Sequence, residues 1–135
     1  MAEKLKLEMV TPYKQVLSEE VDEIIMPGQL GQLGILPGHT PLLTTLKMGE
    51  FTYRKGGSSF HVAVNWGYVE VEDDTVIVLA ETAEPADEID MARAKAAMGR
   101  AEEALKRLDP EDKDYRIMEA ALNRALIRIQ VAGDN

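Results

Sequence analysis

The sequence predicts an antiparallel β-sandwich, or flattened barrel, followed by an antiparallel hairpin of two helices. Apolar and polar residues alternate in short runs over roughly the first 80 positions, and turn residues separate these runs. After Thr82 the apolar residues recur every three or four positions instead. Short strands without helices between them are typical of sandwiches and barrels. We therefore expect a β domain at residues 1–84 and a helical domain at residues 85–135.

The first strands are marked by alternation and by turn residues. Residues 4–10 alternate leucine or methionine with charged residues, which predicts a half-buried strand that ends at Thr11-Pro12. Residues 16–17 and 21–26 are expected to form further short strands. Pro27-Gly28 is then expected to turn the chain.

Residues 30–43 are unusually rich in glycine and proline. Glycines at positions 31, 34 and 38 and prolines at 37 and 41 alternate with leucine and isoleucine, which predicts a buried, sharply turned crossing. No Gly-Lys-Ser/Thr follows, so these glycines do not indicate a phosphate loop. His39 has no second histidine or cysteine nearby, which favours a hydrogen-bonded structural role over metal binding.

Two β-hairpins complete the predicted sandwich. Residues 51–55 and 60–64 alternate on either side of Gly56-Gly57, which is a strong two-residue turn sequence. Residues 68–72 and 75–80 flank Asp73-Asp74 in the same way.

Two helices are predicted after the sandwich. Pro85 with Asp87 or Asp90 marks the start of the first helix, Asp109-Pro110 marks its end, and the second helix begins at Asp114. The connection is short, so the helices are expected to lie antiparallel with their apolar faces in contact. The apolar positions are Met91, Ala94, Met98, Ala101, Leu105 and Leu108 in the first helix and Tyr115, Met118, Leu122, Ala125 and Ile129 in the second.

The first helix is rich in alanine, which limits the apolar area that the hairpin can bury. Because little burial opposes the chain entropy, the hairpin is expected to be marginally stable by itself. Two interpretations stay open. The hairpin is either a static element or one that can detach, extend and dock again.

Composition excludes several classes of protein. The formal net charge of −9 argues against nucleic acid as a partner. The chain has no cysteine, no apolar run of the roughly 20 residues that a membrane span needs, and a charged N-terminus unlike a signal peptide, so we expect a soluble protein that is not exported. Most of the excess negative charge lies in the first domain, which indicates either solubility or an anionic or acidic partner for the second domain.

The residues contain no catalytic constellation and no set of metal ligands with suitable spacing, so an independent enzyme is not expected. Arg124 and Arg128 lie four positions apart on the second predicted helix and therefore share a face, with Arg116 two turns earlier. Two explanations remain: the arginines bind phosphates or carboxylates of a partner, or they form a solvated face.

Three segments resemble one known family. Gly-Gln-Leu-Gly-Ile-Leu-Pro-Gly-His-Thr-Pro-Leu-Leu at residues 31–43 is similar to the signature of the epsilon subunits of bacterial F-type ATP synthases. Trp-Gly-Tyr-Val-Glu-Val at residues 66–71 and Ile-Asp-Met-Ala-Arg-Ala at residues 89–94 resemble two further motifs of this family. The resemblance covers essentially the whole chain.

The resemblance implies a non-catalytic rotor subunit in the central stalk of a proton-translocating ATP synthase. The sandwich would bind the gamma subunit and the membrane rotor ring, the c-ring, and so couple ring rotation to the catalytic head. The helices would extend to the beta and alpha subunits and inhibit ATP hydrolysis, and fold down to release it. Such a subunit is peripheral and lies on the cytoplasmic face of the bacterial inner membrane.

The resemblance also implies two sites. No cofactor is required, but ATP is expected as a regulatory ligand of the folded-down hairpin. The rotor ring is expected to contact Gln29, Leu30, Gly31 and Gln32. The family usually has an acidic residue at the position of Gln32, so an ion pair with the ring is in doubt here. Two alternatives stay open: the Gln32 amide forms a hydrogen bond with the ring loops, or the turn is simply exposed to solvent. The residues expected to bind ATP are Glu84, Ile89, Asp90, Arg93, Ala94, Arg124 and Arg128.

A second function from another class stays open. The chain would then be a stand-alone small-molecule-binding or adaptor domain that uses the same hairpin without a rotary partner. An independent hydrolase is the weakest alternative, because the residues for it are missing.

Overall fold

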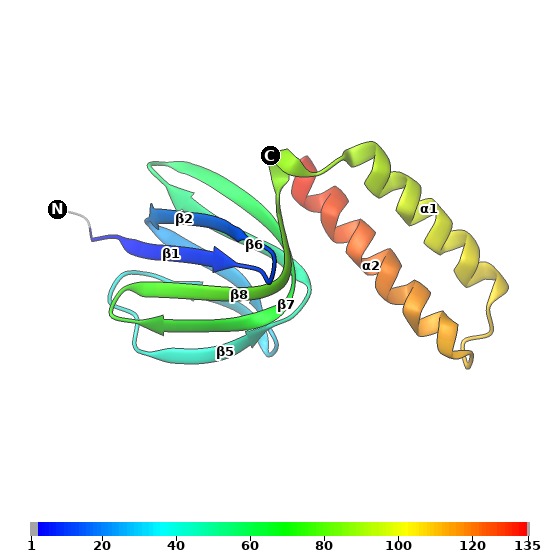
Figure 1. The fold of residues 1–135 in the computed structure, drawn as a ribbon, viewed down its shortest axis with the longest axis horizontal. Coiled ribbons are helices and arrows are strands. Elements are labelled where there is room, and N and C mark those ends of the chain that lie inside the picture. The colour runs from blue at the N-terminus through cyan, green and yellow to red at the C-terminus, as the bar shows by residue number, and fades with distance from the viewer. Residues whose placement is uncertain (1–2, 135) are drawn as a thin grey trace.

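The computed structural model describes residues 3–134 and places a β-sandwich and a helical hairpin side by side (Figure 1). Residues 1, 2 and 135, which belong to the two predicted domains, lie outside the described residues. In chain order the elements are β1 (Leu5–Val10), β2 (Gln15–Val21), β3 (Glu23–Gly28), β4 (Gly31–Ile35), β5 (Leu42–Leu46), β6 (Gly49–Lys55), β7 (Ser58–Glu72), β8 (Thr75–Pro85), η1 (Ala86–Glu88), α1 (Met91–Arg107) and α2 (Lys113–Gly133).

The strands form one sheet that folds over on itself to make the two layers of the sandwich. The strand order is β2-β1-β8-β7-β5-β3-β4, and β6 bridges β3 and β7. The long strand β7 pairs with β6 through its first half and with β5 through its second half, so it belongs to both layers. The predicted sandwich is confirmed, with one difference: β1 runs parallel to β8 in a sheet whose other described pairs are antiparallel.

A single apolar core lies between the two layers. Alternation along β1 buries Leu5, Leu7 and Met9 completely, and Phe51 of β6 is the largest fully buried side chain. All buried members of this core come from strands β1 to β8, and none comes from a helix. The hydrophobic interior of the sandwich is therefore complete without the hairpin.

The expectation of a buried crossing at residues 30–43 is wrong for much of the stretch. Residues 31–35 form β4, which lies at the end of the strand order and pairs with β3 alone among the described strands. Ile35 is buried, but Leu30, Leu36 and Leu43 are exposed, because an edge strand and its turns cover only one face of the core. Pro27-Gly28 is also not a turn. It lies inside β3, where the Pro27 carbonyl accepts a hydrogen bond from the Lys47 N–H at 3.0 Å.

Residues 60–64 and 68–72, which were predicted as separate strands, belong to the single strand β7. The strand continues through Trp66, which adopts a left-handed backbone with φ of 52°: Asn65 pairs with Thr82 on one side of it, and Gly67 pairs with Ala80 on the other. Both predicted two-residue turns are confirmed. Gly56-Gly57 and Asp73-Asp74 have the positive φ angles that such hairpin turns need.

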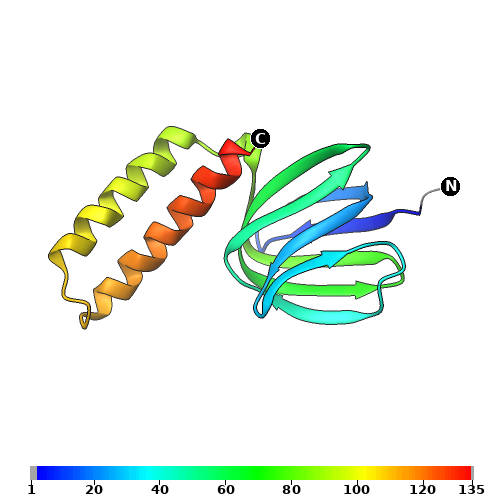
Figure 2. The same ribbon diagram turned by 180° about the vertical axis from the view of Figure 1, so that it is seen from behind.

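The predicted antiparallel helical hairpin is confirmed (Figure 2). The Asp90 carboxylate caps α1 by accepting the Arg93 N–H at 3.1 Å, and the Asp112 carboxylate accepts the Asp114 N–H at 2.9 Å at the start of α2. The buried residues along the two helices are mostly alanines, which let the helices approach closely. Over residues 3–134, no helix is both long enough and apolar enough to cross a lipid bilayer.

The hairpin packs on the sandwich through α2 rather than α1. The last turns of α2 contact β6, β7 and η1. A small apolar cluster joins the two parts there: Val131 packs against Ala63 and Ala86, with Ile89 and Ile127 at its edge. This cluster is much smaller than the core of the sandwich, so the attachment of the hairpin rests on few apolar contacts.

Candidate functional site

A cleft of about 480 Å³ lies between the sandwich and the hairpin. Strands β7 and β8 form one wall, and α2 with one residue of α1 forms the other. Because the walls belong to different parts of the molecule, the cleft exists only while the hairpin is docked. Its lining residues are Met48, Ala63, Val64, Asn65, Thr82, Ala83, Glu84, Ala97, Ala121, Arg124, Ala125, Ile127 and Arg128.

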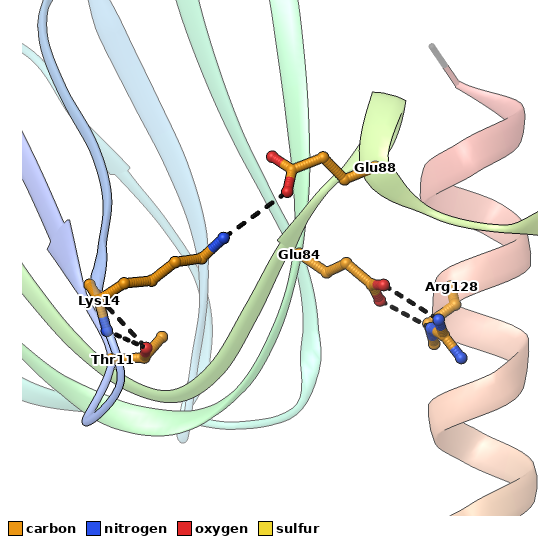
Figure 3. Close-up of polar contacts among 5 residues, drawn as sticks. All are labelled: Thr11, Lys14, Glu84, Glu88 and Arg128. Atoms are coloured by element: carbon orange, nitrogen blue, oxygen red, sulfur yellow. Dashed lines mark hydrogen bonds and ion pairs between the residues drawn. The ribbon is translucent and has the colours of Figure 1, made fainter.

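A bidentate ion pair between Glu84 of β8 and Arg128 of α2 crosses the cleft (Figure 3). Arg128 Nε donates to Glu84 Oε1 at 2.7 Å, and Arg128 Nη2 donates to Glu84 Oε2 at 3.0 Å. Both side chains are about one third exposed or less. This geometry fixes the guanidinium plane and holds one arginine at the mouth of the cleft.

Arg124 lies one turn before Arg128 on the same helix face and also lines the cleft. It is exposed, and its guanidinium group makes no ion pair or hydrogen bond with a described residue. Arg116, although close to the same face by spacing, does not line the cleft. The cleft therefore presents one paired and one free guanidinium group, which suits an anionic ligand.

Asn65 of β7 lines the cleft and was not identified from the sequence. Its side-chain oxygen is buried and has no hydrogen-bond partner among the described residues. A buried polar oxygen without a donor is unfavourable, so a ligand with an N–H or O–H group would stabilise it. No local pattern marks Asn65, which precedes the left-handed Trp66 in β7.

Four of the expected ATP-binding residues lie outside the cleft. Ile89 packs in the small apolar cluster at the junction, and Ala94 is buried along α1. Asp90 caps α1, and the exposed Arg93 lies in its first turn. The structure thus brings Glu84, Arg124 and Arg128 together in the cleft, but it does not bring these four residues to the same lining.

The expected ring-contact residues lie at the turn between β3 and β4. Leu30 is fully exposed and Gln32 is exposed, whereas the Gln29 N–H donates to the Thr45 carbonyl at 3.1 Å. Gly31 has a φ of 133°, which a residue with a side chain rarely adopts. The turn is therefore held in one shape while its apolar tip stays in contact with solvent.

A further apolar surface lies on β7 and β8, and no residue of α2 lines it. Trp66, Tyr68 and Leu79 are each more than half exposed there, and they line a shallow hollow with Pro12. Exposed aromatic residues gathered on one face are typical of a surface that another protein covers.

Ion pairs and polar contacts also tie the chain near η1. Lys14 Nζ lies 3.8 Å from Glu88 Oε1, and in the loop before β2 the Lys14 N–H donates a hydrogen bond to Thr11 Oγ1 at 3.3 Å (Figure 3). Both members of the ion pair are exposed, so this contact contributes little to stability.

A cluster of titratable side chains lies at the C-terminal end of α2 and was also not predicted from the sequence. Glu50 of β6, His61 of β7 and Asp134 meet there. Burial, followed by the adjacent Asp134 carboxyl group, raises the pKa of Glu50 to about 7, while the Gln130 amide acts in the opposite direction. These residues are far apart in the sequence, so no spacing could have indicated the cluster.

Comparison with protein families gives two matches that together span most of the chain. Residues 4–86 match the family described as ATP synthase, Delta/Epsilon chain, beta-sandwich domain. Residues 87–133 match the family described as ATP synthase, Delta/Epsilon chain, long alpha-helix domain.

Curated relatives are similar over nearly their full length. The ATP synthase epsilon chains of Geobacter sulfurreducens and Geobacter metallireducens are each 71% identical over 133 residues, which cover 98% of this chain and 96% of the relative. The ATP synthase epsilon chain 2 of Syntrophotalea carbinolica is 70% identical with the same coverage.

Two solved structures share the fold. One chain of the Euglena gracilis mitochondrial ATP synthase, solved as OSCP/F1/c-ring in rotational state 1, aligns with a TM-score of 0.80 at 24% identity and covers 96% of this chain and 81% of that chain. A chain from the central stalk and c-ring of the Tetrahymena thermophila mitochondrial ATP synthase aligns with a TM-score of 0.56 at 17% identity, over 98% of this chain and 96% of that chain. On the family matches and the near full-length identity to epsilon chains, this chain belongs to the ATP synthase delta/epsilon family, as an epsilon-type subunit of the synthase rather than an enzyme by itself.

Proposed function

We propose that the chain is the central-stalk subunit that joins the gamma subunit to the c-ring in a proton-translocating F-type ATP synthase, so that ring rotation reaches the catalytic head. The apolar surface at Trp66, Tyr68 and Leu79 supports a protein partner on one side of the sandwich. The exposed Leu30 turn supports a second contact, with the polar loops of the ring. In this role the subunit is peripheral, on the cytoplasmic face of the bacterial inner membrane.

The helical hairpin regulates the complex in this proposal. Docked on the sandwich it permits ATP hydrolysis, and extended along gamma it inhibits hydrolysis by contacting the beta and alpha subunits. The small apolar cluster at Val131 supports this role, because a hairpin held by so few contacts can leave the sandwich at a cost of a few kcal/mol.

ATP is the regulatory ligand of the docked form. The observation that carries this part is the cleft at the junction, where the free Arg124 and the paired Arg128 face the sandwich across a volume of about 480 Å³. A ligand that needs both walls binds the docked form better, and by linkage it shifts the equilibrium toward that form. Contact with Asp90 and Arg93 would require the start of α1 to move toward the cleft.

ATP binding is tested by titrating the full chain and following its backbone NMR signals together with the heat of binding. ATP is expected to shift the signals of Asp90, Arg93, Arg124 and Arg128. Arg124→Ala should weaken binding about tenfold or more, because a charge-assisted hydrogen bond to phosphate is lost. Arg116→Ala removes an arginine of the same helix that does not line the cleft, so it should bind as the native chain does. No shift at millimolar ATP, or equal losses in both variants, would remove the nucleotide from the proposal.

The role in the complex is tested by co-purification and truncation. The chain should be recovered with the gamma subunit, whereas a stand-alone adaptor or small-molecule-binding domain would be recovered without it. Deleting residues 86–135 should leave coupling intact and weaken the inhibition of ATP hydrolysis. If the truncated chain failed to assemble, the proposed division of labour between sandwich and hairpin would be wrong.

A further inference from the structure

Three side chains with metal-binding atoms meet where the end of α2 reaches the sandwich. Glu50 comes from β6, His61 from β7 and Asp134 from the residue after α2, and their ligand atoms all lie within 4.8 Å of one another. His61 Nδ1 is 3.7 Å from Glu50 Oε2. None of the three residues lines the cleft between Glu84 and Arg124, so this is a separate place in the molecule.

One oxygen of this cluster lacks a partner. Glu50 Oε2 is buried and accepts no hydrogen bond from a described residue, while the other oxygen accepts only a long bond of 3.4 Å from the Gln130 amide. The Glu50 and His61 side chains are 18% and 16% exposed. A carboxylate oxygen without a donor in such a place is unfavourable, and a bound cation would remove the penalty.

The charges in the cluster also favour a cation. The Glu50 and Asp134 carboxyl groups lie side by side, with ligand atoms within 4.8 Å of each other. No lysine or arginine forms an ion pair with either carboxylate among the described residues. The two adjacent carboxyl groups and the imidazole therefore face one another without a lysine or arginine between them among the described residues.

We propose that Glu50, His61 and Asp134 form a site for a divalent transition metal of the Zn²⁺ type, with water as the fourth ligand. An imidazole and two carboxylates are ligands that Zn²⁺ accepts in tetrahedral sites, whereas Mg²⁺ and Ca²⁺ require six or more oxygen ligands. Ligand atoms around tetrahedral Zn²⁺ lie about 3.4 Å apart, so the pair at 3.7 Å needs little movement and Asp134 would close inward.

The site would link the hairpin to the sandwich. Two ligands belong to strands of the sandwich and the third to the end of α2, so a metal bound by all three binds the docked form better than the detached form. Thr52 Oγ1 lies 3.1 Å from His61 Nδ1 and holds the imidazole toward Glu50. If the metal takes Nδ1, it replaces a hydrogen bond from this hydroxyl group, and Thr52→Val should therefore bind Zn²⁺ at least as tightly as the native chain.

The proposal is tested on the full chain by titrating Zn²⁺ in competition with a chromogenic chelator near neutral pH. One Zn²⁺ per chain is expected to bind, with an affinity in the micromolar range or better. His61→Asn, Glu50→Gln and Asp134→Asn should each weaken binding about tenfold or more, because each removes one of three protein ligands. His39→Asn is the matched control, since it removes the other histidine, which lies in the loop before β5 and contacts Thr40. Thermal unfolding without metal verifies that every variant is folded.

A second measurement tests the link to docking. Zn²⁺ should slow amide hydrogen exchange in the last turns of α2 in the native chain and in His39→Asn, but not in His61→Asn. The proposal is overturned if no Zn²⁺ binds at micromolar concentrations, or if the His39 and His61 variants bind Zn²⁺ equally. It is also overturned if equimolar Mg²⁺ displaces the bound Zn²⁺, because this would indicate a general attraction of cations to acidic groups.

Discussion

At the scale of single residues, a few side chains fix how the hairpin meets the sandwich. The Glu84–Arg128 pair is partly exposed, so its contribution to stability is about 1 kcal/mol at most, but its two parallel hydrogen bonds set the angle at which α2 approaches β8. With Arg128 held in this way, Arg124 remains available at the same cleft. The Glu84–Arg128 pair therefore contributes more to the orientation of α2 along the cleft than to the stability of the fold.

At Gly67 the backbone of β8 leaves no room for a side chain on β7. A Cβ at this position would collide with the Leu79 carbonyl oxygen and lie 3.0 Å from the Ala80 Cα, and both are backbone atoms that cannot rotate away. We expect Gly67→Ala to lower the free energy of unfolding by roughly 1–3 kcal/mol, measured by urea denaturation. Gly34→Ala in β4 is the control, because nothing lies within 4 Å of its added Cβ. Equal effects of the two substitutions would contradict the close approach.

Asp22, between β2 and β3, is expected to make the stability of the sandwich depend on pH in the acid range. A hydrogen bond from the Lys4 side chain, followed by one from the Gly56 N–H at 2.9 Å, lowers the pKa of Asp22 below its ordinary value of 3.8. A carboxyl group whose pKa falls on folding stabilises the fold above its unfolded pKa, and this contribution is lost as the pH falls through the folded pKa. Asp22→Asn should therefore destabilise the chain at about pH 6, and the difference should shrink below about pH 4.

The measurement for Asp22 is urea denaturation at a series of pH values. Glu70→Gln, which neutralises an exposed carboxylate of β7 that makes no ion pair with a described residue, is the control and should show little difference at either pH. A loss of stability in Asp22→Asn that stays constant down to about pH 2.5 would show that titration of this group is not the cause.

At the scale of elements, the sequence predicts those turns and helices that residues a few positions apart determine. The turns at Gly56-Gly57 and Asp73-Asp74 and both helices follow from turn residues, caps and periodicity, which act over a few positions. The continuity of β7 does not, since Trp66 holds a left-handed backbone only because pairing with β8 resumes on both sides of it. The parallel pairing of β1 with β8 joins residues some seventy positions apart and leaves no local pattern.

The candidate site divides in the same way. The spacing of Arg124 and Arg128 predicts a shared helix face, and family resemblance adds Glu84 from a distant strand. Asn65, Glu50 and His61 could not be identified, because their importance comes from burial beside α2, which depends on how the hairpin docks. The sequence therefore indicates the arginines that one helix provides and, through family resemblance, Glu84 of the sheet, but it gives no sign of Asn65.

Val131 is the apolar anchor of α2. It is fully buried against Ala63 and Ala86, although it lies near the end of the helix. Val131→Ala should weaken docking by about 1–3 kcal/mol through the loss of two buried methyl groups, so hydrogen exchange in α2 and proteolysis near residues 86–90 should accelerate. Leu126→Ala is the control, because Leu126 is about half exposed and outside the cluster. Unchanged exchange in Val131→Ala would show that other contacts hold the hairpin.

At the scale of the whole molecule, the sandwich and the hairpin differ in how much apolar surface each buries. The sandwich encloses its own core, whereas the hairpin is lined by alanines and touches the sandwich near one end of α2 (Figures 1 and 2). The cleft and the Glu50 cluster both lie at this single junction. Ligands bound at the junction would therefore act on the position of the hairpin rather than on the integrity of the sandwich.

This arrangement predicts that the sandwich folds without the hairpin. Among residues 3–134, no buried member of the sandwich core lies after Ala80, so a chain ending at Pro85 keeps that core. It loses the Val131 cluster, the partly exposed Glu84–Arg128 pair, and the exposed contacts of Lys14 with Glu88 and of Gln130 with Glu50. We expect it to unfold cooperatively, with a midpoint temperature roughly 10–20 °C below that of the full chain, because the lost docking contacts amount to a few kcal/mol and about 1 kcal/mol corresponds to roughly 4–8 °C for a domain of this size. Thermal unfolding followed by circular dichroism and by the fluorescence of Trp66 measures this. A broad transition, or a truncated chain without fixed side-chain packing, would mean that the strands need α2 to complete their fold, and the hairpin could then not leave the sandwich without unfolding it.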